Sequence, residues 1–365
     1  MIIKGTQSNH RRENGAMAKK LRVGVVGTGM GRYHMEGFAK QEDTELVAIC
    51  DLNVPEAWQF ARQYGVTKVF DDYREMFSLP ELDAVSIATP NNLHAPMAID
   101  ALRKGKHVLV EKPMALNAKE ARAMVAAAKK AGKRLMVEQA MRFSPDAQML
   151  RAYAERGECG NVYYARSTWI RRKGWPRLNF EPGGSMGRGE WFIRKDEAGF
   201  GALGDIGVHL IDLAWYLMGT PKPLSVAGMT WNKVAAPILK RKNMPVEVDE
   251  MACGFIRLEG DRVISVEICW DSHNAPVQEA RIYGEKGGCS LFPARLYRGE
   301  DVLESVDLST QYGGLPITDA YTHFIECIRD PKKKMIASGE EIVHLMQMLD
   351  ALVRSAATGK EQAVK

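Results

Sequence analysis

The sequence predicts a doubly wound α/β domain over residues 21–140, followed by an α+β domain over residues 141–365. Three observations support this fold class. The chain has 365 residues, enough for about two domains of roughly 150 residues each. Short β-rich apolar runs alternate with helical patterns up to residue 140, as in a parallel sheet covered by helices. Beyond residue 141 the strand-like runs follow one another directly, which is typical of antiparallel sheets.

The first domain is expected to contain six strands, and a capped helix precedes the last of them. The strands are predicted at Val23–Gly27, Leu46–Asp51, Lys68–Asp71, Ala84–Thr89, His107–Glu111 and Leu135–Glu138. Asn117 with Glu120 three residues later forms a capping box, and Gly132 ends the Ala-rich helix that it begins.

The second domain is expected to build a mostly antiparallel sheet. Its strands are predicted at Val162–Ile170, Leu224–Lys233, Met251–Glu259, Arg262–Trp270 and Ala280–Tyr283. The Glu259-Gly260-Asp261 link is a hairpin-type turn between two of them. Two helices near Ala320–Arg329 and Gly339–Ser355 close the chain, and Gly359 is a plausible stop signal.

The composition indicates a globular protein and argues against several kinds of partner. With 45% hydrophobic and 26% charged residues, the chain can bury a full core. Its net charge of +5 is too small to indicate nucleic acid or an anionic membrane as the main partner, and no run of about 18 apolar residues predicts a membrane helix. The positive charge is local: residues 1–22 carry +5 and residues 166–195 carry +6.

The leader and the cysteines bear on location. Residues 1–20 are expected to be disordered, and they lack the apolar segment of about 7 to 15 residues that a secretory signal needs. The six cysteines form no C-x-x-C pair, which favours a reducing compartment and argues against a metal framework. The cytoplasm is therefore the expected location.

A glycine-rich turn follows the first predicted strand. The run Gly27-Thr28-Gly29-Met30-Gly31 would let backbone N–H groups meet a pyrophosphate at a helix N-terminus, although a plain structural turn is the alternative. Gly31 comes one residue before the third glycine of G-x-G-x-x-G. Asp51 ends the second strand 24 residues after Gly27, where a carboxylate can accept from both ribose hydroxyls. Because Leu52 and Asn53 follow, with no Arg for a 2′-phosphate, NAD is favoured over NADP; a solvated Asp51 is the alternative.

Two further loops end parallel strands, at the edge where ligands bind in such sheets. One is Thr89-Pro90-Asn91 with His94, and the other is Glu111-Lys112-Pro113. The proline disfavours helical backbone at Lys112, which is expected to aim the side chain into the cleft. A surface lysine is the alternative.

Asp205 and His209 open an apolar helix that ends near Gly219. Their i, i+4 spacing is expected to place them on one helical face. An imidazole beside a carboxylate and a lysine suits proton transfer during alcohol oxidation, since histidine titrates in the useful range. The alternatives are a buried structural histidine and a metal site with Asp212, which leaves the common face and is joined by no cysteine or second histidine.

Together these motifs resemble the Gfo/Idh/MocA family of glucose-fructose oxidoreductase, inositol dehydrogenase and rhizopine-catabolism proteins. The resemblance rests on Gly27-x-Gly29 with His34, Thr89-Pro90-Asn91 with His94, Glu111-Lys112-Pro113 and Asp205-x-x-x-His209, and it extends from about residue 21 to residues 355–360. It implies a Rossmann domain, an open-faced sheet domain, a tightly held nicotinamide cofactor, and homodimers or homotetramers packed through that sheet.

The resemblance also implies roles for individual residues. Lys112 would polarise the reacting oxygen, His209 would be the general acid or base, and Asp205 would orient the sugar. The cofactor would be contacted by Asp51, Thr89, Asn91, His94 and Glu111.

A basic, aromatic stretch over residues 166–195 precedes the Asp205 helix. It contains Arg171 and Trp175, followed by Trp191 and Phe192. Aromatic rings pair with the apolar faces of sugars and arginine binds carboxylates, so this stretch is expected to line the substrate site, with a solvated or oligomer-packing loop as the alternative.

Together these expectations predict an NAD-dependent dehydrogenase that oxidises a ring hydroxyl of a sugar, glycoside or cyclitol, such as a glucoside 3-dehydrogenase or inositol 2-dehydrogenase. A redox-neutral hydrolase or epimerase is the second hypothesis. A regulator that senses cofactor or sugar is the third, and the presence of both Lys112 and His209 weighs against it.

Overall fold

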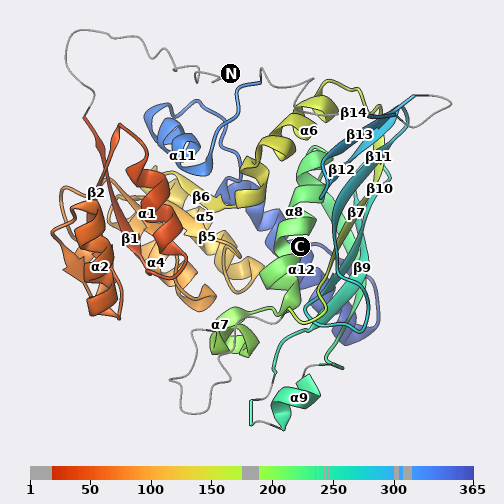
Figure 1. Cartoon of the computed structure of the whole chain (residues 1–365), viewed down its shortest axis with the longest axis horizontal. Helices are drawn as coiled ribbons and strands as arrows, with labels where there is room; N and C mark the ends of the chain where they lie inside the picture. The colour runs from red at the N-terminus through yellow and green to blue at the C-terminus, as the bar shows by residue number, and fades with distance from the viewer. Residues whose placement is uncertain are drawn as a thin grey trace.

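A computed structural model describes residues 19–174, 189–234, 236–241, 243–244, 246–299, 304–306 and 315–365. The chain forms a helix-covered parallel sheet beside a larger sheet; the last helix, α12 (Gly339–Thr358), lies between them, and α11 (Ala320–Arg329) lies against the parallel-sheet half (Figure 1). Nearly all of the leader 1–20, and Trp175, lie outside the described residues.

The first sheet has six parallel strands in the order β3-β2-β1-β4-β5-β6. Its strands are β1 (Leu21–Val26), β2 (Thr44–Cys50), β3 (Val69–Phe70), β4 (Ala84–Ile87), β5 (His107–Glu111) and β6 (Leu135–Glu138). Its helices are α1 (Gly31–Ala39), α2 (Val54–Tyr64), α3 (Tyr73–Phe77), α4 (Asn91–Arg103) and α5 (Ala118–Ala131). The order reverses between β1 and β4, which defines a switch point where ligands bind in such sheets. The predicted doubly wound fold is confirmed.

Local sequence signals explain where these helices begin and end. Asn117 accepts the backbone N–H of Glu120 at 3.0 Å, and the Glu120 side chain accepts in return from the N–H of Leu116 at 3.2 Å. Gly132 ends α5 in the left-handed conformation, with φ of 62°, which costs glycine little. The Asn117 cap expected from the sequence is therefore present, but the return bond of Glu120 goes to Leu116, one residue before the N-cap.

The second sheet has nine strands in the order β14-β13-β12-β11-β7-β10-β9-β8-β15. Only its β7–β10 pair is parallel among the described pairings. The strands are β7 (Val162–Ile170), β8 (Pro223–Trp231), β9 (Met251–Leu258), β10 (Arg262–Cys269), β11 (Val277–Gly284), β12 (Gly287–Leu291), β13 (Arg295–Arg298), β14 (Glu304–Val306) and β15 (Gln362–Ala363). The sequence did not predict β12 to β15, which are short and lie at the two edges of the sheet.

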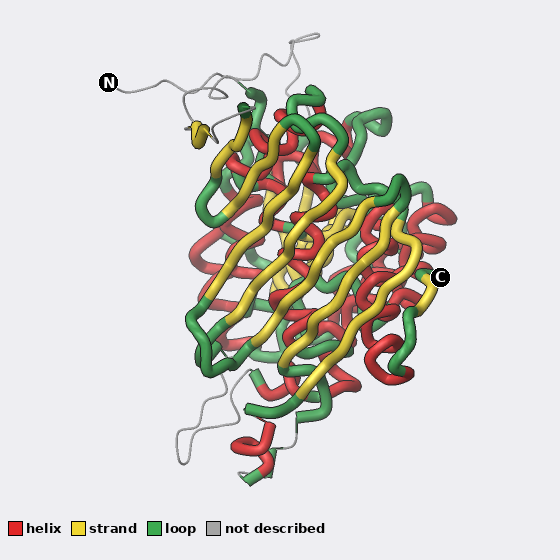
Figure 2. The backbone as a smooth tube through the Cα atoms, turned by 90° about the vertical axis from the view of Figure 1, so that its right-hand side faces the viewer, coloured by secondary structure: helices red, strands yellow, loops and turns green. Residues whose placement is uncertain are grey.

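Helices cover one face of this sheet and leave the other open, as Figure 2 shows. The helices of this half are α6 (Pro145–Glu155), α7 (Lys195–Ala198), α8 (Val208–Leu217), α9 (Ala236–Lys240), α11 (Ala320–Arg329) and α12 (Gly339–Thr358), with short helical turns η1 (Ala140–Phe143), η2 (Glu190–Ile193) and η3 (Leu203–Gly207). The mostly antiparallel, open-faced sheet matches the expectation.

The C-terminal helices join the two halves. Phe324 and Ile325 of α11 are buried in one apolar cluster with Val23 and Leu109 of the parallel sheet. The backbone N–H of Ala118, at the start of α5, donates to Asp350 of α12 at 2.9 Å. Within the described residues, no helix is both long and apolar enough to cross a membrane.

Candidate active site

A cavity of about 280 Å³ lies at the carboxyl ends of β4, β5 and β6 and reaches η3 and α8. Several residues singled out in the sequence line it: Met30, Thr89, Asn91, Glu111, Lys112, Asp205 and His209. Residues from both halves of the chain, almost 100 positions apart, therefore meet in one site.

Lys112 and Asp205 form the polar centre of this cavity. The Lys112 Nζ donates to the backbone carbonyl of Asp205 at 2.9 Å and lies 3.6 Å from its Oδ1. The indole Nε1 of Trp270 donates to Asp205 Oδ2 at 2.9 Å, and an Arg171 guanidinium nitrogen lies 3.9 Å from the same oxygen. The carboxylate is thus held between two cations and an indole, which fixes its orientation.

His209 is a neutral imidazole at the same site. Burial, and then the charges of Lys112 and Arg171, hold the pKa of His209 well below its usual range. Its Nδ1 is buried and has no hydrogen-bond partner among the described residues. A neutral ring with a free nitrogen beside a lysine can accept a proton near neutral pH.

The helix that carries this pair differs from the expected one. Residues Leu203–Gly207 form a π-helical turn, η3, before the regular helix α8 begins at Val208. A Cβ at Gly204 would lie 2.7 Å from Phe200 Cβ, and one at Gly207 would lie 3.2 Å from Ile268, so glycine permits the close packing there. Asp205 and His209 still line the same cavity, but they do so across a widened turn, a form that is frequent at functional sites.

The glycine-rich turn fits a dinucleotide. Gly27 has φ of +88°, and a side chain there would overlap the backbone carbonyl of Ala88. A Cβ at Gly29 would meet no described atom within 4 Å, whereas one at Gly31 would lie 3.0 Å from Val25 of β1. The three glycines thus serve a tight turn, an open approach and close helix packing, the functions they have in dinucleotide-binding turns. The shorter spacing of Gly31 preserves the third function.

The first turn of α1 is suited to an anion. No side chain caps this helix among the described residues, and its first turn has no acidic residue. Its backbone N–H groups are therefore available to a pyrophosphate.

Asp51 lies beside this turn. Its Oδ2 accepts the backbone N–H of Thr28 at 2.6 Å and the Thr28 hydroxyl at 2.8 Å, and its Oδ1 accepts the N–H of Asn53 at 2.8 Å. A carboxylate has about four acceptor positions, so about one remains for a ribose hydroxyl.

Three side chains that are predicted to contact the cofactor form hydrogen bonds around the cavity. The ring nitrogens of His94 face the carbonyls of Pro113 at 2.8 Å and Thr89 at 2.9 Å, and the side chain is fully buried. The Asn91 amide donates to the carbonyl of Ala198 at 2.9 Å, which ties α4 to α7. Glu111 bonds the His34 ring at 2.9 Å. Direct ligand contact by His94, expected from the resemblance, does not fit its burial; the ring instead joins two ligand-facing loops.

The aromatic stretch contributes two rings. Trp191 and Phe192 of η2 stack at 3.8 Å and line the cavity, and the Arg171 guanidinium lies 4.7 Å from the centre of the Trp169 ring. The part of the expectation that concerns Trp175 falls outside the described residues.

Sequence analysis missed three residues of this site. Glu138, Phe200 and Trp270 either line the cavity or bond its residues. Glu138 could have been found, because it ends the sixth predicted strand at the same edge as Lys112. Phe200 and Trp270 carry no local signal, since only tertiary packing brings them to the site.

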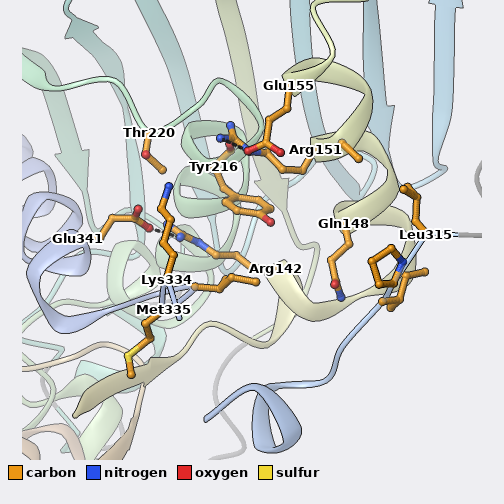
Figure 3. Close-up of a pocket in the computed structure, with 14 residues that line it drawn as sticks. Arg142, Gln148, Arg151, Glu155, Tyr216, Thr220, Leu315, Lys334, Met335 and Glu341 are labelled. Carbon is orange, nitrogen blue, oxygen red and sulfur yellow. Dashed lines mark hydrogen bonds and ion pairs between the residues drawn. The ribbon is translucent and has the colours of Figure 1, made fainter. Parts of the chain in front are cut away.

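A second cavity of similar volume lies between α6, the end of α8 and the segment around Met335 (Figure 3). Its charged groups are largely paired with one another: Arg142 bonds Asp212 and Glu341, and Arg151 bonds Glu155. Asp212 forms an ion pair with Arg142 at 2.6 Å and does not line the cavity that contains His209. The Arg142 pairs join η1 to α8 and α12, whereas Arg151 and Glu155 pair within α6, so these charges have structural partners.

Comparisons with known proteins identify the family of this chain. Residues 21–139 match the family model described as "Oxidoreductase family, NAD-binding Rossmann fold", and residues 147–290 match the "GFO/IDH/MocA C-terminal domain". D-glucoside 3-dehydrogenase of Escherichia coli is 29% identical over 352 residues, which covers 93% of this chain and 96% of that protein. Levoglucosan dehydrogenase of Pseudarthrobacter phenanthrenivorans is 32% identical over 70% of this chain and 69% of its own.

A solved structure shows the same fold. Levoglucosan dehydrogenase in complex with NADH and levoglucosan superposes with a TM-score of 0.81 at 27% identity, over 95% of this chain and 100% of that chain. The chain belongs to the Gfo/Idh/MocA family of oxidoreductases, whose N-terminal domain is an NAD-binding Rossmann fold.

Proposed function

We propose that this protein is an NAD-dependent dehydrogenase that oxidises a ring secondary hydroxyl of a sugar, glycoside or cyclitol to a ketone. One observation carries the proposal: Lys112, Asp205 and a neutral His209 line a single cavity that Met30 of the dinucleotide turn also reaches. Alcohol oxidation requires a hydride acceptor and a base side by side.

Three side chains have separate roles in the proposed proton transfer. The Lys112 ammonium donates a hydrogen bond to the reacting oxygen and stabilises the negative charge that develops there. Asp205, held by Trp270, fixes Lys112 and orients the sugar. Neutral His209 accepts the hydroxyl proton. A bound nicotinamide ring would supply the hydride acceptor.

NAD is the proposed cofactor. The Asp51 carboxylate lies at the end of β2 beside the glycine turn, where it would repel the 2′-phosphate of NADP. Leu52 and Asn53 follow it and offer no cation to bind that phosphate.

A pyranose ring is the proposed substrate moiety. Trp191 and Phe192 offer an aromatic wall to its apolar face, and Arg171 beside Asp205 could bind a hydroxyl or a carboxylate. The names of the relatives, a D-glucoside 3-dehydrogenase and a levoglucosan dehydrogenase, favour glycosides and anhydrosugars over inositols.

A homodimer or homotetramer is the proposed assembly, packed through the open face of the nine-stranded sheet. Phe255 and Met229 lie on that face and are 57% and 43% exposed. Large exposed apolar side chains on one face are typical of an interface. All six cysteines are unpaired, which supports a reducing location such as the cytoplasm.

The test is NADH formation from NAD or NADP with glycosides, anhydrosugars, free sugars, inositols, uronates and sugar phosphates. We expect NADH to accumulate with one class and NAD to be preferred. Lys112→Ala should lower kcat by roughly 10²–10⁴-fold while NADH still binds. Sugar conversion without NADH would instead indicate a redox-neutral cycle. NADH binding with no turnover on any substrate would favour a sensor.

A further inference from the structure

Glu138 is a buried carboxyl group in the active-site cavity that the proton-transfer scheme does not use. It ends β6, lines the cavity and is 7% exposed. Its Oε2 is buried and has no hydrogen-bond partner among the described residues. A polar atom left unpaired in this way is costly unless a ligand or water satisfies it.

The groups around Glu138 come from three other elements, β5, α1 and α11. Glu111 of β5 is its register partner, so both side chains lie on the same face of the sheet. His34 of α1 bonds Glu111, Lys112 follows Glu111, and Asp319 and Tyr321 approach from the start of α11.

These neighbours keep one proton on the carboxyl pair. Burial opposes ionisation of Glu111, but the His34 hydrogen bond and nearby charges hold its pKa below the usual value. Burial, and then the charges of Glu111 and Asp319, raise the pKa of Glu138 to about 8. At neutral pH the protonated Glu138 therefore offers an O–H donor and a carbonyl acceptor side by side.

The position of Glu138 indicates which ligand group it meets. Asp51 and the glycine turn would hold the first nucleotide half over β1 and β2, so the second half would lie over β4 to β6, where Glu138 is. The second half of a nicotinamide dinucleotide carries a primary amide, whose donor and acceptor complement a neutral carboxylic acid. We infer that Glu138 binds the carboxamide of the nicotinamide ring through a pair of hydrogen bonds; this rests on the proposed use of a nicotinamide cofactor.

Binding of two nucleotides to three proteins tests the inference. NADH carries the carboxamide on an uncharged ring, and ADP-ribose lacks the nicotinamide. Glu138→Leu removes both hydrogen-bonding groups, whereas Glu138→Gln keeps a donor and an acceptor and cannot titrate. We expect Glu138→Leu to weaken NADH binding about tenfold or more and ADP-ribose binding less than about twofold. Glu138→Gln should stay within about threefold of wild type for both.

The pH dependence of NADH binding is the second readout. Ionisation removes the O–H donor, so wild-type affinity should fall as the pH rises through about 8, while Glu138→Gln should show no such fall. Equal weakening of NADH and ADP-ribose by Glu138→Leu, no weakening of either, or equal effects of the two substitutions would overturn the inference. If wild type binds NADH no more tightly than ADP-ribose, the proposed nicotinamide cofactor itself is wrong, and the inference with it.

Discussion

His209 depends on its neighbours for its chemistry more than any other residue of the site. Two cations, Lys112 and Arg171, act on a buried imidazole, and both disfavour its protonated form. The imidazole is therefore unprotonated at neutral pH, and the proposed mechanism uses it to accept the proton of the reacting hydroxyl. In the proposed mechanism Lys112 would have two functions: it would bind the reacting oxygen, and its charge lowers the pKa of His209.

This arrangement predicts the direction in which the pH profile moves. Activity requires neutral His209, so kcat/KM falls as the pH drops through the depressed pKa of His209. Arg171→Gln removes one of the depressing charges, and the acid limb should move to higher pH. Arg172→Gln is the matched control, because Arg172 is exposed and is not among the charges that shift His209. Steady-state kinetics extended below pH 5, as far as the protein stays folded, measure both acid limbs, and an acid limb unmoved by Arg171→Gln would exclude this source of the shift.

The sequence predicts a residue of this site when a local pattern, such as the end of a strand, determines its position. Lys112 and Asp51 follow recognisable strands, and parallel strands place their carboxyl ends at one edge. Trp270 follows β10 in the other half of the chain and reaches Asp205 through tertiary packing alone. His94 shows a subtler limit: its position after Thr89 is evident from the sequence, but only the fold shows that its ring faces two backbone carbonyls.

The turn between β1 and α1 contains three glycines, and a different physical reason favours glycine at each of them. Gly27 needs a positive φ and contact with the Ala88 backbone, Gly29 leaves open space, and Gly31 lets α1 pack on Val25. The first and third requirements concern folding, and the second concerns a ligand.

Alanine substitutions should separate these requirements. Gly27→Ala should lower the free energy of unfolding by roughly 1–3 kcal/mol or more, because a side chain there has a positive φ and overlaps Ala88. Gly29→Ala should change the free energy of unfolding by less than about 0.5 kcal/mol but weaken NADH binding about tenfold. Denaturant unfolding and fluorescence titration give the two quantities. Unchanged NADH affinity in Gly29→Ala would show that the open space does not face the cofactor.

The elements that sequence reasoning missed share a physical cause. Strands β13 and β15 are four and two residues long, too short for an alternating pattern to stand out. The π-turn η3 depends on Phe200 and Ile268 packing against Gly204 and Gly207, and no local propensity encodes those contacts. Long, capped elements such as α5 and α12 were predictable because their own residues determine where they begin and end.

At the scale of the whole molecule, the two faces of the nine-stranded sheet differ in composition. Val226 and Ile256 point to the helix-covered face and are fully buried, whereas Ala227 and Phe255 pair on the opposite face. The open face also carries Arg166 near Glu267 and Glu279, a mixture of apolar and paired charged groups. Such a surface suits association with a second copy that presents the same face.

Charge introduced on that face should therefore dissociate the protein. In a symmetric interface each Phe255→Glu substitution places two carboxylates in the buried area, so we expect a shift toward smaller species by light scattering after size exclusion at micromolar concentration. Leu52→Glu is the control: Leu52 is 88% exposed but lies on the parallel-sheet domain, and the assembly should be unchanged. Circular dichroism must show that Phe255→Glu remains folded.

Because the cavity of one chain already contains Lys112, Asp205 and His209, the dissociated variant should retain NADH binding. A wild-type monomer, or a Phe255→Glu protein of unchanged mass, would exclude the open face as the interface.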